Sequence, residues 1–251
     1  MDNLIIKNKK ETVLTASNWK EGFIAVDERR HWEPGRSAER LANDFSNGNP
    51  SSGEKSLRNI IKLFLRSDDI LWKEAYIEHG SKFDKYRRPR MQDLAIWGEF
   101  SGQSFFVGVE AKVDEPFGSR TIKEQEAYIK SLSRKTNAGR RLTELKEDFL
   151  QGIEKAVYEE FRYQLLYYLA GSFREEPNII IMPVIAYNSK LCNKQKAEDN
   201  YNAYTSFMTN LGFTKIAEND GEIKIAYSAE ITDHKGGKTK RVYSCYIEKD
   251  S

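Results

Sequence analysis

The sequence predicts an α/β protein in which a mixed sheet is flanked by helices and followed by a C-terminal β-rich extension. Apolar residues recur every three or four positions in several segments, which is typical of helices with one buried side. In other segments they alternate with polar residues or form short continuous runs, which is typical of strands. The 251 residues approach the size at which one core stops growing, about 250–300 residues, so we expect a single domain over 1–251.

Composition excludes several classes of protein. The 40 Lys and Arg residues nearly balance the 38 Asp and Glu residues, so a strongly basic DNA-coating protein is excluded. Two cysteines and three scattered histidines do not form a structural zinc site. No apolar stretch approaches the ~20 residues of a membrane helix, and the first residues lack the pattern of a secretory signal. We therefore expect a cytoplasmic protein with no membrane partner.

The first half of the chain predicts helices followed by a hairpin. Three helices are expected, over 37–45, 57–65 and 69–78. Two segments of strand character follow, over 93–100 and 104–113. The spacer Ser101-Gly102-Gln103 between them suits the turn of an antiparallel hairpin.

The second half predicts further helices, a buried strand and a group of C-terminal strands. Thr121 and Glu124 have the spacing of a capping box, so a helix is expected from there to about Leu132. A basic turn over 134–141 comes next, and then one long helix with apolar residues at four-residue steps from 153 to 169. The remaining elements are a strand over 179–186, a helix over 201–211 and strands over 213–218, 222–231 and 240–248.

Two carboxylates and an amine are expected to meet at one end of the hairpin. Asp93 begins its first strand, and Glu110 and Lys112, two residues apart on the same side, end its second. Paired carboxylates are hard oxygen ligands for Mg²⁺, and a nearby ammonium neutralises developing charge or orients a water molecule. The arrangement suits phosphodiester hydrolysis. The alternative is a solvated strand end with a weak Glu–Lys ion pair.

This pattern resembles the signature of the PD-(D/E)XK nuclease superfamily, which is an Asp, a strand hairpin and then Glu-x-Lys. Asp93 and Glu110-Ala111-Lys112 match it. The resemblance implies a restriction-endonuclease-like sheet, with the core order helix, three strands, helix, strand over about 32–187 and a C-terminal α/β extension over 188–251. The segments 32–38 and 109–118 also resemble an uncharacterised bacterial family usually grouped with these nucleases.

The resemblance implies roles for individual residues. Asp93 and Glu110 would hold Mg²⁺ or Mn²⁺, and Lys112 would position the attacking water. Glu39 would add a metal ligand, although an acid in the first turn of a helix is also favoured by the helix dipole. Gln164 and Tyr168 lie one turn apart and look like a Gln-x-x-x-Tyr motif that contacts nucleic acid. Arg162, which lies nearby, is a third candidate for nucleic-acid binding. The alternative is an ordinary helix edge.

Basic residues on both sides of this pattern are candidates for phosphate contacts. They are Lys85, Arg87, Arg88, Arg90, Lys135, Arg140 and Arg141. The alternative for them is ordinary loop solubility, and His31 is a weaker candidate for a general base.

The resemblance therefore predicts a divalent-metal-dependent nuclease, with DNA as the expected polymer and bacterial defence or DNA processing as the setting. A homodimer is expected where both strands of a duplex are cut, and many nucleases of this kind are guided by a partner protein. The alternatives are an inactive nucleic-acid- or protein-binding module on the same fold, or an interaction protein that dimerises through its C-terminal strands.

Overall fold

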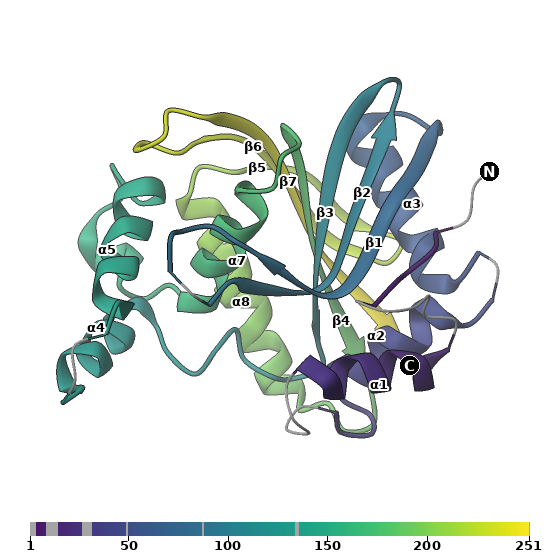
Figure 1. Cartoon of the computed structure of the whole chain (residues 1–251), viewed down its shortest axis with the longest axis horizontal. Coiled ribbons are helices and arrows are strands. Elements are labelled where there is room, and N and C mark those ends of the chain that lie inside the picture. Colours follow the sequence, from purple (N-terminus) through teal and green to yellow (C-terminus); the bar gives the residue numbers. More distant parts are fainter. Residues whose placement is uncertain are drawn as a thin grey trace.

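A seven-stranded mixed sheet runs through the computed structural model, and helices lie on both of its faces (Figure 1). The structure describes residues 4–8, 15–26, 32–48, 50–86, 88–133 and 136–250. Its strands are β1 (Ile70–Ser81), β2 (Arg90–Phe100), β3 (Gln103–Lys112), β4 (Ile179–Asn188), β5 (Thr214–Asp220), β6 (Ile223–Thr232) and β7 (Thr239–Asp250).

The strands lie in the order β1-β2-β3-β4-β7-β6-β5. β1, β2 and β3 pair antiparallel, β4 is parallel to both β3 and β7, and β7, β6 and β5 pair antiparallel again. The C-terminal strands therefore continue the same sheet, and β7 lies beside β4 at its centre.

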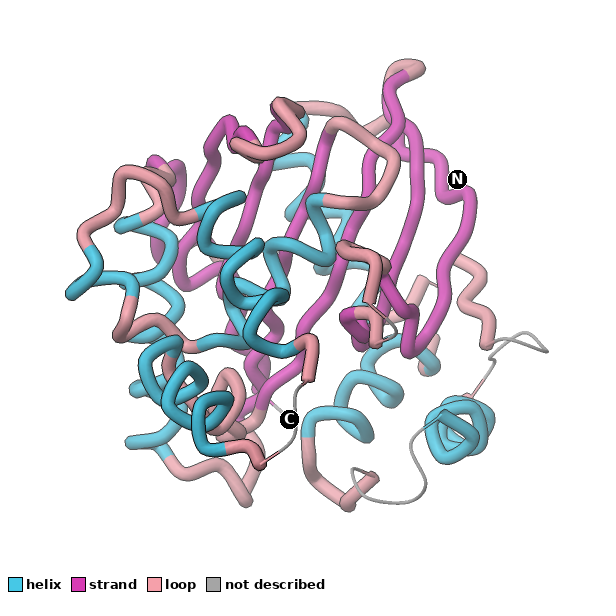
Figure 2. Tube along the Cα trace, turned by 60° about the vertical axis from the view of Figure 1, so that its left-hand side comes forward, coloured by secondary structure: helices cyan, strands magenta, loops and turns pink. Residues whose placement is uncertain are grey.

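The helices divide between the two faces of the sheet, as Figure 2 shows for the helical segments in cyan. They are α1 (Ala16–Val26), α2 (Ser37–Ser46), α3 (Ser52–Leu65), α4 (Ile122–Ser131), α5 (Ala138–Phe149), α6 (Lys155–Tyr158), α7 (Tyr163–Phe173) and α8 (Lys194–Asn210). The first three contribute to one core, and α5, α7 and α8 contribute to the other. Among the described residues, no helix combines the length and the apolar character needed to cross a membrane.

The alternation in β3 explains why both faces need helices. Phe105, Val107 and Val109 point into the core under α2 and α3, and Phe106 points into the core under α7. All four side chains are buried. A strand that is apolar on both sides belongs at the middle of a covered sheet, and its position between β2 and β4 agrees with this.

The predicted hairpin is confirmed. β2 and β3 pair antiparallel as far as Phe100 and Gln103, and the two residues between them, Ser101 and Gly102, have φ values of 45° and 77°. Positive φ at both central residues is the conformation that closes a two-residue hairpin. The predicted helix beginning at Thr121 is also confirmed, with its capping box to Glu124.

The segment 69–78, expected as a short helix, is strand β1 instead. Its pairing with β2 is irregular between Trp72 and Glu74, which is where a bulge adds one residue to the strand. Buried side chains therefore fall at Ile70 and Trp72 before the bulge and at Ala75 and Ile77 after it. Across the bulge the buried residues are three positions apart, as they are in a helix. The sequence therefore does not show the two-residue period that is typical of a strand.

The long helix expected from 153 to 169 is interrupted. α6 ends at Tyr158 and α7 begins at Tyr163, because the backbone between them bonds to the start of α4. Ile122 N–H donates to Phe161 O at 2.9 Å, and Tyr163 N–H donates to Arg120 O at 3.1 Å. α7 also continues through Gly171 to Phe173 rather than ending before it.

The basic turn expected over 134–141 is also corrected, because α5 begins at Ala138 and includes Arg140 and Arg141. The other predicted elements are observed, but α3 begins at Ser52 rather than at 57 and α8 begins at Lys194 rather than at 201.

Candidate active site

Asp93, Glu110 and Lys112 meet where β2 begins and β3 ends. The antiparallel register, in which Leu94 lies opposite Val109, places the start of one strand beside the end of the other. The three residues line a cavity of about 660 Å³, whose lining also includes Ser37 on α2 and Gln164 on α7. The structure therefore brings the three predicted residues together.

The Glu110 carboxylate is the centre of this cluster, and its side chain is only 2% exposed. Lys112 Nζ and Gln164 Nε2 each donate to Oε1 at 2.7 Å. Arg90 Nη2 donates to the other oxygen, Oε2. Burial alone raises the pKa of Glu110, but the charges of Arg90 and Lys112 hold that pKa below its ordinary value.

Asp93 behaves differently from Glu110. Its Oδ2 accepts a hydrogen bond from Ala111 N–H at 2.7 Å, and the residue is partly exposed. Burial, and then repulsion from Glu110, raise the pKa of Asp93 to about 7, although Lys112 and Arg90 oppose the shift. Two neighbouring carboxylates thus differ in pKa, which is common at functional sites.

The shifted pKa predicts a pH-dependent effect of Asp93→Asn on stability, measured in EDTA. Because the folded-state pKa of about 7 exceeds the ordinary 3.8, the folded chain binds this proton more tightly between those values. The stability contributed by the protonated carboxyl is complete below about pH 4 and is lost as the pH rises through 7. The Asn variant has no such loss, so its Tm minus that of the parent should increase from pH 4 to pH 7 and then level off.

The total change should be on the order of a few kcal/mol, and calorimetry at a series of pH values between 4 and 8 measures it. A Tm difference that does not vary with pH would contradict this prediction.

Gln164 and Tyr168 have separate roles. Gln164 is half-buried, and its amide orients Glu110 as described above. Tyr168 is fully buried, so the expectation that it contacts nucleic acid is wrong. Its hydroxyl donates to Gly108 O and lies 3.1 Å from Pro183 O, between β3 and β4.

The position of Tyr168 has a physical explanation in the sheet. The ladder between β3 and β4 pairs Val107 with Ile181 and Glu110 with Val184, but it is interrupted between these pairs, where Pro183 lies. Proline has no N–H to donate, and a buried carbonyl without a donor is costly. The Tyr168 hydroxyl supplies that donor to Gly108 O, so this part of the motif stabilises the sheet beneath the site.

Glu39 does not join the other carboxylates. Its Oε2 accepts a hydrogen bond from Gly35 N–H at 2.5 Å, and Glu39 is not among the residues that line the cavity. In the ranges that the structure describes, no group of three or more His, Cys, Asp or Glu side chains is arranged to hold a metal ion. The structure therefore does not bring Glu39 to the cavity that Asp93 and Glu110 line, and its role as a metal ligand stays a prediction.

The remaining donor set fits a hard divalent cation by its chemistry. Mg²⁺ is usually bound by one or two carboxylates together with water and substrate phosphates. Asp93 and Glu110 provide two such carboxylates beside a cavity large enough for the other ligands. The difference from an open metal site is that both oxygens of Glu110 already accept hydrogen bonds.

The predicted basic residues have different surroundings. Arg88 is exposed and lines the cavity. Arg90 is paired with Glu110, and Arg141 with Asp84 at 2.6 Å, so neither is a free phosphate contact. Lys85 and Arg140 are exposed, and Arg162 is half-buried at the start of α7. Arg87, Lys135 and His31 lie outside the described residues.

Sequence reasoning missed the pairing of Arg90 with Glu110. Glu115 also lines the cavity, where its carboxylate accepts hydrogen bonds from Val113 N–H at 2.7 Å and from Ser37 Oγ at 3.2 Å. The pairing of Arg90 with Glu110 and the contact of Ser37 with Glu115 join separate segments of the chain, and no local pattern in the sequence indicates these two contacts.

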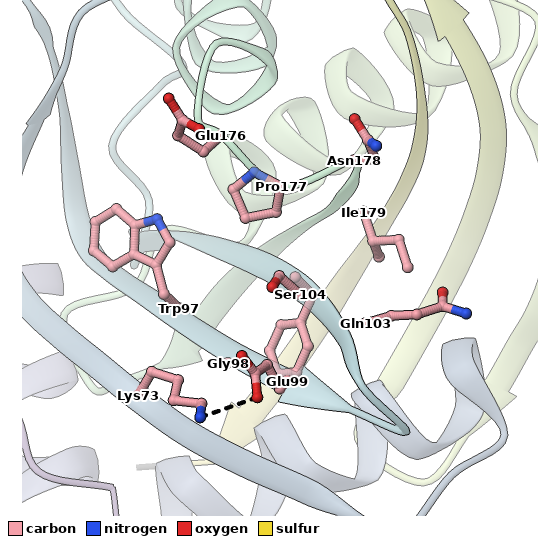
Figure 3. Close-up of a pocket in the computed structure, with 11 residues that line it drawn as sticks. Lys73, Trp97, Gly98, Glu99, Gln103, Ser104, Glu176, Pro177, Asn178 and Ile179 are labelled. Carbon is pink, nitrogen blue, oxygen red and sulfur yellow. Dashed lines mark ion pairs between the residues drawn. The ribbon is translucent and has the colours of Figure 1, made fainter.

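A second pocket, of about 710 Å³, lies at the other end of β2 and β3 (Figure 3). Its ion pair joins Lys73 and Glu99 at 3.0 Å, and the two side chains are 44% and 39% exposed. Oppositely charged side chains that are exposed to solvent interact weakly. The buried charges around Glu110 make the other cavity the better candidate for a functional site.

The fold and the site define an α/β protein with a buried, oppositely charged cluster at the end of a hairpin in a mixed sheet. The family model of a domain of unknown function, DUF6946, matches residues 12–235, and the chain belongs to this family. The match contains every residue of the site described above. No curated protein and no solved structure matches the chain.

Proposed function

We propose that the protein is a divalent-metal-dependent nuclease that hydrolyses phosphodiester bonds, with DNA as its expected substrate. One observation supports this most: Asp93, Glu110 and Lys112, the residues of the predicted signature, face one cavity, and Gln164 reaches the same carboxylate. A solvated strand end would not have a Glu side chain that is 2% exposed and accepts three hydrogen bonds.

The order of elements also supports a restriction-endonuclease-like core. Helices α2 and α3 precede the three antiparallel strands β1, β2 and β3, and helices α4 to α7 precede β4, which is parallel to β3. This is the order helix, three strands, helix, strand. The strand that completes the group of three is β1, whose segment the sequence pattern predicted to be a helix.

Each residue then has a physical role in the proposed reaction. Asp93 and Glu110 would hold Mg²⁺ or Mn²⁺, which when bound supplies Lewis-acid chemistry and a more acidic water. Lys112 places an ammonium within 2.7 Å of Glu110, where it neutralises negative charge near a phosphate. Gln164 orients Glu110, and the exposed Arg88 at the cavity attracts a phosphate backbone.

The test is incubation of the purified protein with supercoiled plasmid, single-stranded DNA and RNA, each in Mg²⁺, Mn²⁺ or EDTA. We expect cutting of DNA in the presence of either ion and none in EDTA. Asp93→Ala, which removes one of the two carboxylates, should remove the activity without unfolding the chain. If only RNA is cut, the proposed substrate changes from DNA to RNA, while the proposed hydrolysis of phosphodiester bonds stands.

A divalent-ion thermal shift separates this proposal from a binding module on the same fold. Clustered carboxylates that bind an ion in the folded chain raise its Tm through linkage. Salt-dependent DNA binding, with neither cutting nor an ion-induced shift, would contradict the nuclease and favour the module. Light scattering in the same experiments tests the proposed homodimer.

A further inference from the structure

Arg90 is one of two enclosed cations at the site, the other being Lys112. Its side chain is 9% exposed, its Nη2 donates to Glu110 Oε2, and its guanidinium lies 5.6 Å from the centre of the Tyr168 ring. Its Nε is buried without a hydrogen-bond partner in the described part of the chain. A guanidinium has five N–H donors, so this charge is held at one carboxylate while part of it remains unsatisfied.

Helix α7 leaves space for the Arg90 side chain at a glycine. A Cβ added at Gly171 would lie 2.8 Å from both Cβ and Cγ of Arg90, which is closer than real contacts allow. Glycine at this position permits the helix to approach β2 with the arginine between them. The contact between Arg90 and Glu110 is therefore supported by two separate elements.

The charges of the cluster balance when both of its carboxylates are ionised. Asp93 and Glu110 carry two negative charges when ionised, and Arg90 and Lys112 carry two positive charges. A divalent ion added to this buried set leaves an excess of two positive charges, which is costly where solvent screening is weak. The cost falls if a cation leaves the cluster or an anion enters with the ion.

We propose that Arg90 is the counter-cation of the site in the absence of a metal, and that it competes with a divalent ion for Glu110. This rests on the proposed function. The Oε2 atom of Glu110 serves either the guanidinium or the ion. A released Arg90 faces the cavity that it already lines, next to Arg88, where it adds a positive charge for a phosphate of the substrate.

The test measures Mn²⁺ binding without nucleic acid, by calorimetry and by the ion-induced change in Tm. Removing the competing charge in Arg90→Met should lower the Kd for Mn²⁺ by at least about ten-fold. Arg90→Lys keeps the positive charge and should bind Mn²⁺ close to the parent. Lys73→Met is the control, and it should have little effect because Lys73 is 44% exposed and lies in the pocket at the other end of the hairpin.

A second variant keeps the test decisive if Arg90→Met does not fold. Gly171→Ala leaves every charge in place but forces Arg90 away from its position, and the gain in helix propensity, up to about 1 kcal/mol, offsets part of the strain. Its Mn²⁺ affinity should lie between those of the parent and Arg90→Met. Arg90→Met and Gly171→Ala proteins that fold but bind Mn²⁺ as weakly as the parent, or more weakly, would overturn the proposal.

Failure of this inference is distinguishable from failure of the proposed function. A parent that binds Mn²⁺ or cuts DNA, with no tighter binding in the variants, contradicts only the role of Arg90. A parent and variants that neither bind Mn²⁺ nor cut any nucleic acid contradict both.

Discussion

Lys112→Met is expected to reduce the rate of metal-dependent DNA cutting by at least about 100-fold. The methionine keeps most of the aliphatic stem beside the Phe117 ring, which the ammonium approaches to 5.3 Å, but it removes the charge next to Glu110. Asp93 and Glu110 remain, so the variant should still bind Mn²⁺. The initial rate of plasmid nicking at saturating Mn²⁺ measures the effect.

Lys73→Met is the matched control for this variant. Lys73 also forms an ion pair with a glutamate, at 3.0 Å, but in the exposed pocket at the other end of the hairpin. It should cut DNA at the rate of the parent. A folded Lys112→Met protein that binds Mn²⁺ and keeps more than about a tenth of the parent rate would show that Lys112 has only a structural role.

Glu110→Gln is expected to lower the Tm by roughly 10 °C. Glutamine fills the same space but leaves the side chains of Arg90 and Lys112, which are 9% and 8% exposed, without their shared counter-charge. Removing one partner from a buried ion pair costs about 3–5 kcal/mol. In a chain of this size each kcal/mol corresponds to about 2–4 °C. Thermal unfolding followed by circular dichroism in EDTA measures the change.

Two comparisons make this result specific. Glu99→Gln breaks the exposed pair with Lys73 and should cost less than about 1 kcal/mol. Adding Arg90→Met to Glu110→Gln removes one uncompensated cation and should recover part of the lost stability. A Tm for Glu110→Gln within about 2 °C of the parent would show that Glu110 is protonated in the folded chain, against the direction of its pKa shift.

Local patterns predicted the central part of the fold and the centre of the site. The hairpin of β2 and β3 could be predicted because alternation, a Gly-containing turn and register all lie within about twenty residues. That register alone fixes where Asp93 lies relative to Glu110 and Lys112. The position of these three residues therefore needed no knowledge of the remaining strands.

The parts that the sequence could not predict depend on distant contacts. Tyr168 is buried because Pro183 leaves a carbonyl of β3 without a donor, and a hydroxyl on a third element supplies the missing hydrogen. Arg90 pairs with Glu110 because Gly171 lets a helix approach. Both effects join segments that are sixty or more positions apart. The local sequence around Tyr168 and Arg90 therefore predicts contacts with nucleic acid instead.

The central place of β7 has a consequence for how the chain folds during synthesis. β4 is buried along nearly its whole length, and its outer edge pairs with β7, the last of the seven strands to leave the ribosome. Until that strand emerges, an apolar strand of Ile, Met and Val residues has one row of unpaired backbone groups, which is a template for aggregation. The nascent chain should therefore need protection by a chaperone until residues 239–250 are free, and a fused C-terminal partner should require a linker to leave this strand unhindered.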